Sequence, residues 1–359
     1  MKNNIFPQEE LEVLTHLLET NTPSGYEKQI ITFIKNEFKG KNIYTDIIGN
    51  LYIHAGKGAH KVMITAHCDE VGFQITSIDD AGFAYARKLG GLDRHTIPGT
   101  KVIVVDAEEE IVGVFGKKSP HVQTPEEREK ILELDDLWVD FGYSSKEEAL
   151  KHIKPGNYLT AFNTPLFINN NKRVVSKGLD NKVGVFILLE TMKKLTEMKL
   201  GIEVVGVATV QEEIGCRGSI VAAQKVKPDY AFCLDVGIAT DIPSSLERKY
   251  GAFSLGKGPG ICKNPDNNEK IERMLLSVAS NNKIAHQHVI GFRPTGGTET
   301  AKIQLLSEGV VTANISIPNR YMHSVVEMCD LSDIANTIEL LVSAIKELEN
   351  KEPEEFCLF

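Results

Sequence analysis

Apolar side chains recur at helical spacing near both ends of the chain and gather into short runs between them. Residues 7–19 and 26–38 place apolar residues three and four positions apart, which predicts two amphipathic helices. Ser24 and Glu27 have the S-x-x-E spacing of a capping box, so we expect them to open the second helix. A long apolar pattern over residues 331–350 predicts another helix.

Strand-like runs alternate with these helical patterns over most of the chain. Early runs occupy residues 42–47, 50–55 and 61–67, and from about residue 172 strands and helices follow one another, including a strand expected at 251–256. The segment 181–195 is apolar on most faces, which indicates a helix packed against a sheet. The alternation predicts an α/β fold with a mixed β-sheet sandwiched by helices.

The middle of the chain has a different texture. Between residues 71 and 166, short β-like runs are separated by turns rich in Gly, Pro and Asp, as in a small barrel or sandwich. Because alternating strands and helices are predicted both before and after residues 71–166, we interpret this region as an insertion. We expect a discontinuous catalytic domain at 1–70 and 167–359 and an inserted β-rich domain at 71–166.

Composition narrows the choice of partners and location. The 359 residues are 42% hydrophobic and 25% charged, as in globular proteins, and the formal net charge is −9. An acidic chain lacks the basic surface that nucleic acid or an anionic membrane requires. No apolar run approaches the roughly 18 residues of a membrane span, and no signal-like apolar segment is seen. Six cysteines without a C-x-x-C pair favour a reducing, cytoplasmic location.

Five segments combine an apolar run with acids or histidines just after it. Ligands of open α/β sheets bind at the carboxyl ends of strands, so these segments are candidates for a common site. Two histidines and several carboxylates, without a thiolate pair, form the mixed donor set of zinc or cobalt hydrolases. The candidate residues are His67, Asp69, Asp180, Glu212, Glu213, Asp235 and His323.

Each residue alone also has a simpler interpretation. Asp180 has the position of a helix N-cap, and His67 resembles a hydrogen-bonded core histidine. Glu212 and Glu213 follow a buried-strand pattern, where two carboxylates are costly unless a cation or a proton offsets them. The joint occurrence at five strand ends favours a metal site.

A centre with two metal ions has specific needs. One carboxylate must bridge the ions, and Asp180 is central in the sequence order. One of Glu212 and Glu213 must remain free as the general base. Asp69 lies two residues after His67, on the same side of the strand, and could orient its imidazole.

Six segments in this order resemble the signature of the tetrahedral aminopeptidase family. They are AHCDEVGF, KGLDNKVG, VQEEIGCRGS, FCLDVGIATDIP, PTGGTET and RYMHSVVE. This family comprises cytoplasmic di-metal peptidases, including glutamyl and deblocking aminopeptidases, some of them labelled endoglucanases. The resemblance covers essentially the whole chain and implies a zinc-peptidase-like catalytic domain with an inserted barrel-like dimerisation domain.

The resemblance also implies roles for the candidate residues. His67 and Asp235 would bind one metal, Glu213 and His323 the other, and Asp180 both. Glu212 would be the general base and Asp69 would orient His67. The cofactors would be two zinc or cobalt ions, with manganese as an alternative. The inserted domain would form dimers, six of which close into a tetrahedral twelve-subunit shell.

These features predict a metal-dependent aminopeptidase acting on short peptides. A related carboxypeptidase or N-acyl amino acid deacylase is the nearest alternative, although such enzymes usually carry their extra domain after the paired glutamates. A glycosidase mechanism would use the paired carboxylates but not the histidines. An inactive oligomeric scaffold would not require the complete set of metal ligands. Glu299 stands where relatives commonly have Asp, so it either recognises the substrate amine or belongs to an ordinary turn.

Overall fold

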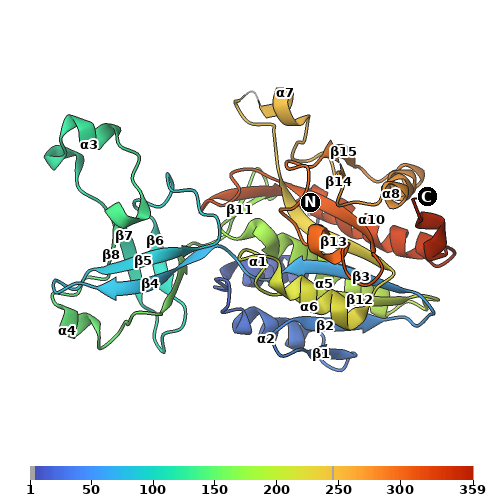
Figure 1. Ribbon diagram of the computed structural model, residues 1–359, viewed down its shortest axis with the longest axis horizontal. Helices are drawn as coiled ribbons and strands as arrows, with labels where there is room; N and C mark the ends of the chain where they lie inside the picture. The colour runs from blue at the N-terminus through green and yellow to red at the C-terminus, as the bar shows by residue number, and fades with distance from the viewer. Residues whose placement is uncertain (1–4, 245, 359) are drawn as a thin grey trace.

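The computed structural model describes residues 5–244 and 246–358, and it has two lobes (Figure 1). The larger lobe is built on an eight-stranded mixed sheet, and the smaller lobe is a closed six-stranded barrel. The prediction of a mixed α/β fold with a β-barrel is confirmed.

The central strands of the large sheet run parallel and carry their carboxyl ends to one edge. In the order β12, β3, β13 and β16, each strand pairs in parallel with the next. Antiparallel strands flank them on both sides. The full order is β1 (Ile43–Thr45), β2 (Leu51–Ala55), β12 (Glu203–Thr209), β3 (Lys61–His67), β13 (Tyr230–Ile238), β16 (Val311–Asn319), β14 (Gly260–Lys263) and β15 (Gln287–Ile290).

Helices cover both faces of this sheet because its central strands are apolar on both sides. Residues such as Ile64 and Phe232 pack with one group of helices, and Met63 and Ala231 pack with the other. The first group is α1 (Gln8–Glu19), α2 (Lys28–Glu37), α5 (Leu179–Thr196), α8 (Glu269–Asn281) and α10 (Leu331–Leu348); the second is α6 (Arg217–Val226) and α9 (Thr300–Ile303). The short helix α7 (Leu246–Tyr250) projects at the top of the view (Figure 1).

The barrel has a hydrophobic core of its own, which includes Phe73, Phe115 and Leu159. Its strands, in order, are β4 (Gly72–Ile78), β5 (Ala84–Leu89), β8 (Trp138–Asp140), β7 (Val112–Gly116), β6 (Lys101–Val104) and β9 (Tyr158–Ala161). The helices α3 (Pro125–Glu129) and α4 (Lys146–Ala149) lie in its connections. A separate three-stranded sheet consists of β10 (Leu166–Ile168), β11 (Arg173–Ser176) and β17 (Glu327–Asp330).

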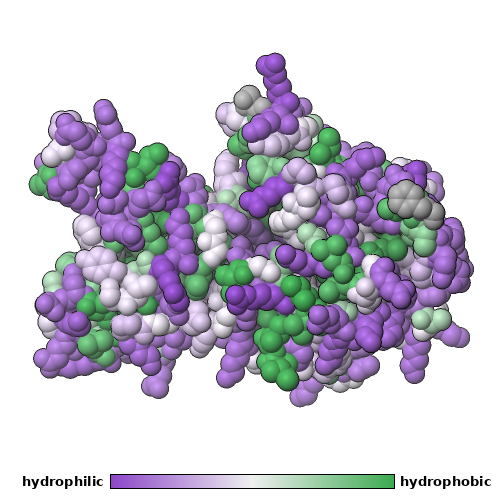
Figure 2. All heavy atoms as spheres, in the orientation of Figure 1, coloured by the Kyte–Doolittle hydropathy of each residue, from purple (hydrophilic) through white to green (hydrophobic). Residues whose placement is uncertain are grey.

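Most of the visible surface is hydrophilic, with hydrophobic side chains in scattered patches on both lobes (Figure 2). Several exposed apolar side chains belong to the barrel, among them Val112, Val114, Val122 and Ile131. Within the described ranges, no helix has the length and apolar character needed to cross a membrane.

Two expected local structures are wrong. The Ser24–Glu27 capping box does not form: α2 begins at Lys28 without a side-chain cap. Ser24 instead donates its hydroxyl to Asp69, and Glu27 accepts the backbone N–H of Gln211, so distant partners take both side chains. Residues 251–256 form no strand, because side chains take backbone groups that a strand would pair with a neighbouring strand: Thr240 accepts the N–H of Phe253, Gln287 that of Ser254, and Asp333 that of Gly256.

Candidate metal centre

Parallel strands bring three of the predicted segments to the same edge of the sheet. His67 is the last residue of β3. Asp235 lies on neighbouring β13, two residues beyond the last pair that joins this strand to β3. Glu212 and Glu213 occupy the turn after β12, which pairs with β3 on its other side. Residues far apart in the sequence therefore meet because their strands are adjacent and parallel.

Asp180 reaches the site from the start of α5 and does not act as an N-cap. Its ψ of 102° is not helical. The regular helix is capped by the neighbouring side chain, since Asn181 Oδ1 accepts the backbone N–H of Gly184 at 3.1 Å. The carboxylate of Asp180 is thereby left to face the other candidate residues.

His323 arrives on a turn that follows β16. Its φ of 60° lies in the left-handed region, which a residue other than glycine adopts at some cost. The imidazole is 32% exposed, whereas that of His67 is 2% exposed. The two histidines therefore differ strongly in their access to solvent.

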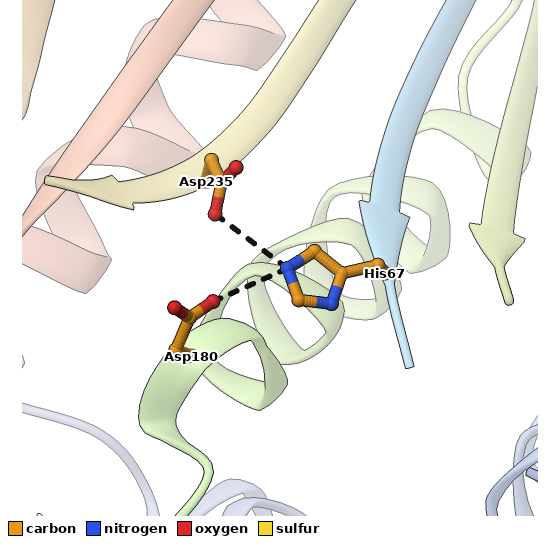
Figure 3. Close-up of side chains that lie close together, drawn as sticks. All are labelled: His67, Asp180 and Asp235. Carbon is orange, nitrogen blue, oxygen red and sulfur yellow. Dashed lines mark ion pairs between the residues drawn. The ribbon is translucent and has the colours of Figure 1, made fainter. Parts of the chain in front are cut away.

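The side chains form two groups that share Asp180. In the first, His67 Nε2 lies 3.2 Å from Asp180 Oδ1 and 3.7 Å from Asp235 Oδ1 (Figure 3). In the second, His323 Nε2 lies 3.2 Å from Asp180 Oδ2 and 3.6 Å from Glu213 Oε2. Each oxygen of Asp180 thus faces a different histidine, and each group offers three donor atoms to one point in space.

The electrostatics of this cluster favour additional positive charge. Among the described residues, the only ion-pair partners of Asp180, Glu213 and Asp235 are the two histidines. Burial raises the pKa of Glu213, and the nearby Asp180 carboxylate raises it further. Burial would lower the pKa of His67, but the neighbouring carboxylates of Asp180 and Asp235 raise it well above its usual value.

Buried carboxylate oxygens without a hydrogen bond also indicate that the cluster can bind cations. Asp180 Oδ1 and Glu213 Oε1 are buried and accept no hydrogen bond within the described part of the chain. Unsatisfied buried carboxylate oxygens are costly, and a divalent cation would satisfy them. The donor set of two imidazoles and three carboxylates fits a pair of divalent cations such as zinc or cobalt.

Glu212 lies beside these groups without belonging to either. Its Oε2 is 3.8 Å from His67 Nε2, and its Oε1 accepts the thiol hydrogen of Cys216 at 3.0 Å. Burial raises the pKa of Glu212 to about 8, with a further contribution from the Asp235 carboxylate. A carboxylate with a raised pKa that faces the cation groups is suited to exchange a proton with a bound water.

Asp69 contacts more than the imidazole that it was expected to orient. His67 Nδ1 is 3.1 Å from the backbone oxygen of Asp69 and 3.5 Å from its carboxylate. That carboxylate accepts the backbone N–H groups of Glu212 and Glu213 at 2.9 and 3.1 Å, and the hydroxyl of Ser24 at 2.6 Å. Asp69 therefore holds the glutamate turn in place. Ser24 is a site residue that the sequence pattern does not reveal, because its S-x-x-E spacing predicts a helix cap.

A cleft of about 840 Å³ opens over the cluster. Both proposed ligand histidines line it, together with Arg293, Lys302 and apolar residues such as Phe253. Glu299 does not line this cleft: it is 2% exposed, and burial raises its pKa. The substrate-amine role considered for Glu299 has no support in this placement.

The fold and the cluster define a metal-dependent hydrolase of the α/β type. The sequence profile of the M42 glutamyl aminopeptidase family matches residues 49–340, so the chain belongs to this family. It is accordingly an aminopeptidase, and the resemblance stated from the sequence is confirmed.

Similar proteins agree over nearly the whole chain. A TET aminopeptidase from the archaeon Thaumarchaeota archaeon SCGC AB-539-E09 is 30% identical, with 98% of this chain and 100% of that chain covered and a TM-score of 0.92. Aminopeptidase APDkam598 from Desulfurococcus kamchatkensis is 33% identical, covering 97% and 96%, with a TM-score of 0.88. The lysyl aminopeptidase of Pyrococcus furiosus is 31% identical, covering 94% and 97%.

The barrel lobe also contacts the cluster, which leads to a first prediction. A Cβ atom on Gly91 would lie 3.1 Å from His323 Nδ1, and the backbone N–H of Asp93 donates to the His323 carbonyl. We expect Gly91→Ala to displace the imidazole by a few tenths of an ångström and lower kcat by about tenfold. Peptidase assays with zinc in excess would measure this.

Gly201→Ala is the matched control. The nearest atom to a Cβ at Gly201 is 3.6 Å away, so this variant should keep the wild-type kcat. Equal kcat values for Gly91→Ala and the wild type would mean that the barrel segment does not restrain His323.

Proposed function

We propose that this chain removes N-terminal residues from short peptides at a centre of two divalent cations. The arrangement that supports this proposal is the pair of donor groups sharing Asp180, with Glu212 outside both. His67, Asp235 and Asp180 would hold one cation, and Glu213, His323 and Asp180 the other. Zinc or cobalt suits these nitrogen and oxygen donors, and manganese is an alternative.

The cations, when bound, would acidify a water molecule and polarise the carbonyl of the first peptide bond. Glu212 acts as the general base: its carboxylate takes a proton from the attacking water and later gives it to the leaving amine. Asp69 keeps Glu212 in place through the backbone N–H at 2.9 Å. Asp69 also helps to orient His67, whose Nδ1 faces its backbone oxygen.

We further propose that the barrel region, residues 71–166, is a dimerisation domain inserted into a catalytic domain of residues 1–70 and 167–359. The exposed apolar side chains of β7, Val112 and Val114, support a protein contact there. Solved relatives include the Pyrococcus horikoshii TET1 peptidase, described as able to assemble into a tetrahedron or a large octahedral shell, and we propose a twelve-subunit tetrahedral assembly from dimers for this chain. A cytoplasmic location is also proposed, and the six unpaired cysteines are consistent with it.

The activity is tested with protein from which a chelator has removed the metal ions. One kind of metal ion at a time is then added back. We expect free amino acid to be released from unblocked peptides and from amino-acid p-nitroanilides only after zinc, cobalt or manganese is added. A panel of p-nitroanilides with different first residues would define the preference.

Peptides with a blocked N-terminus distinguish an aminopeptidase from a deacylase or a carboxypeptidase. An N-acetylated peptide should resist cleavage at its first bond, whereas a deacylase would release acetate and a carboxypeptidase would shorten the other end. Release of reducing sugar from cellulose would indicate a glycosidase. If no metal restores release of N-terminal residues, the proposed function is wrong.

A further inference from the structure

Glu327 is a buried carboxylate that touches the backbone of two proposed ligands without being a ligand itself. It is the first residue of β17 and is 1% exposed. Its Oε1 accepts the backbone N–H of His323 at 2.7 Å, and its Oε2 accepts the backbone N–H of Asp180 at 2.9 Å. Both oxygens are therefore engaged, and neither belongs to the two donor groups.

These two hydrogen bonds join two segments that are far apart in the sequence. Asp180 is the second residue of α5, which follows β11, and His323 belongs to the turn from β16 to β17. On β17, Glu327 pairs with Ser176, which ends β11 four residues before Asp180. One carboxylate thus bridges two chain segments that each supply a donor to the same cation group.

The His323 turn needs such support. Tyr321 and His323 have φ values of 62° and 60°, so the turn contains two residues in the left-handed region. The turn is closed at its base by Arg320 and Met328, whose backbones exchange hydrogen bonds at 3.0 Å. Inside this closure, the short bond from Glu327 restrains the backbone of His323 itself.

The group formed by His67, Asp235 and Asp180 is held in place in a different way. His67 and Asp235 lie on the adjacent strands β3 and β13, within the central sheet. Its geometry is therefore set by strand pairing and needs no carboxylate clamp. Only Asp180 is common to both groups, and its backbone is the second partner of Glu327.

We propose that Glu327 is a positioning residue that sets the separation of Asp180 and His323 and so controls cation affinity at the Asp180–Glu213–His323 group. This inference rests on the proposed function, because it takes that group to be a cation site. Supporting residues of this kind typically change metal affinity by about 10- to 100-fold. The effect on the His67–Asp235 group should be smaller, since only one of its three donors is affected.

Glu327→Gln tests the proposal with almost no change in shape. The amide oxygen can accept one of the two backbone N–H groups, while the amide nitrogen faces the other donor and repels it. We expect equilibrium dialysis against zinc to give two ions per wild-type chain, and in the variant a second ion bound about 10- to 100-fold more weakly. High zinc should restore kcat with an unchanged KM.

Glu272→Gln is the matched control, because Glu272 is 4% exposed on α8 and contacts His288 at 2.7 Å, away from the cluster. It should bind two zinc ions with wild-type affinity. If Glu327→Gln does not fold, Glu327→Asp replaces it, because a shorter carboxylate cannot reach both N–H groups.

The results that overturn the proposal are distinct from those that overturn the function. Wild-type affinity for both zinc ions in the folded variant, or equal weakening of both, would exclude the selective positioning role of Glu327. Failure of the wild-type chain itself to bind two zinc ions would instead remove the proposed function.

Discussion

Replacement of Glu212 by glutamine is expected to lower kcat by roughly 10²- to 10⁴-fold, the usual contribution of general acid–base catalysis, while both cations remain bound. The amide keeps the size of the carboxylate but cannot take a proton from water. Since Glu212 belongs to neither donor group, its charge is not needed to hold a cation. Single-turnover assays on an amino-acid p-nitroanilide, paired with metal analysis, would measure both quantities.

Glu213→Gln provides the contrast at the neighbouring position. Glu213 Oε2 lies 3.6 Å from His323 Nε2, in the second donor group, so this variant should lose one cation as well as activity. An active Glu212→Gln enzyme with two bound cations would show that Glu212 is not the general base. Another acidic residue of the cleft would then have to take that role.

Replacement of Glu70 by glutamine is expected to have the largest effect on stability, a loss of about 3–5 kcal/mol. Glu70 lies between two buried lysines: its Oε1 is 2.6 Å from Lys177 Nζ and 3.1 Å from Lys182 Nζ. Lys182 is fully buried and Lys177 is 3% exposed. Burial lowers the pKa of Lys177 to about 7 even beside Glu70. Without the carboxylate, neither lysine keeps an ion-pair partner among the described residues, so each buried amine must stay charged without a partner or give up its proton.

The position of Glu70 explains why the whole fold depends on it. Its backbone and side chain bind Thr22, Lys182 donates to the carbonyl of Thr20, and Lys177 donates to Thr160 of the barrel strand β9. The cluster therefore joins the N-terminal segment, the catalytic sheet and the barrel. Equilibrium urea unfolding of the metal-free chain, followed by circular dichroism, would measure the loss.

Two comparisons make this prediction specific. Glu190→Gln should cost less than Glu70→Gln, because Lys193 is partly exposed and keeps its contact with Glu37. Lys177→Met added to Glu70→Gln should recover part of the stability, because it replaces a buried amine that has lost its ion-pair partner with an apolar side chain. A loss below 1 kcal/mol in Glu70→Gln alone would contradict the ion-cluster explanation.

The stability that the Glu70–lysine cluster contributes should be lost at low pH. Burial opposes ionisation of Glu70, but Lys177 and Lys182 lower its pKa from 4.5 to about 2. A carboxyl group with a lowered pKa in the folded state contributes stability above its unfolded pKa. That contribution is lost as the pH falls from about 4.5 towards 2, and Glu70→Gln should lack this part of the pH dependence.

The sequence was most informative where a residue depends on its nearest neighbours. Apolar periodicity placed α1 and α10 to within a residue or two, and strand-end acids and histidines identified the residues that the structure brings together. It failed where a distant partner competes with a local one. Ser24 and Glu27 have the pattern of a cap, yet Asp69 and the turn at Gln211 take their side chains.

The contacts of Asp180 and Glu327 are likewise invisible in the local sequence. By position alone, Asp180 is as good an N-cap as Asn181, and only the conformation at the start of α5 assigns the cap to Asn181. Glu327 stands in the quoted segment RYMHSVVE, but its two backbone partners lie 4 and 147 residues away. No spacing within the sequence marks such a contact.

By itself, the sequence determined the α/β alternation and the family, and it predicted the β-rich insertion and a candidate set of cation ligands, because these depend on local periodicity and on residue type. The tertiary structure alone decided which acids face which histidine, that Glu299 is buried away from the cleft, and that Gly91 of the barrel contacts His323. These features depend on strand order and on packing between remote segments, in which hydrogen bonds and desolvation outweigh local preference.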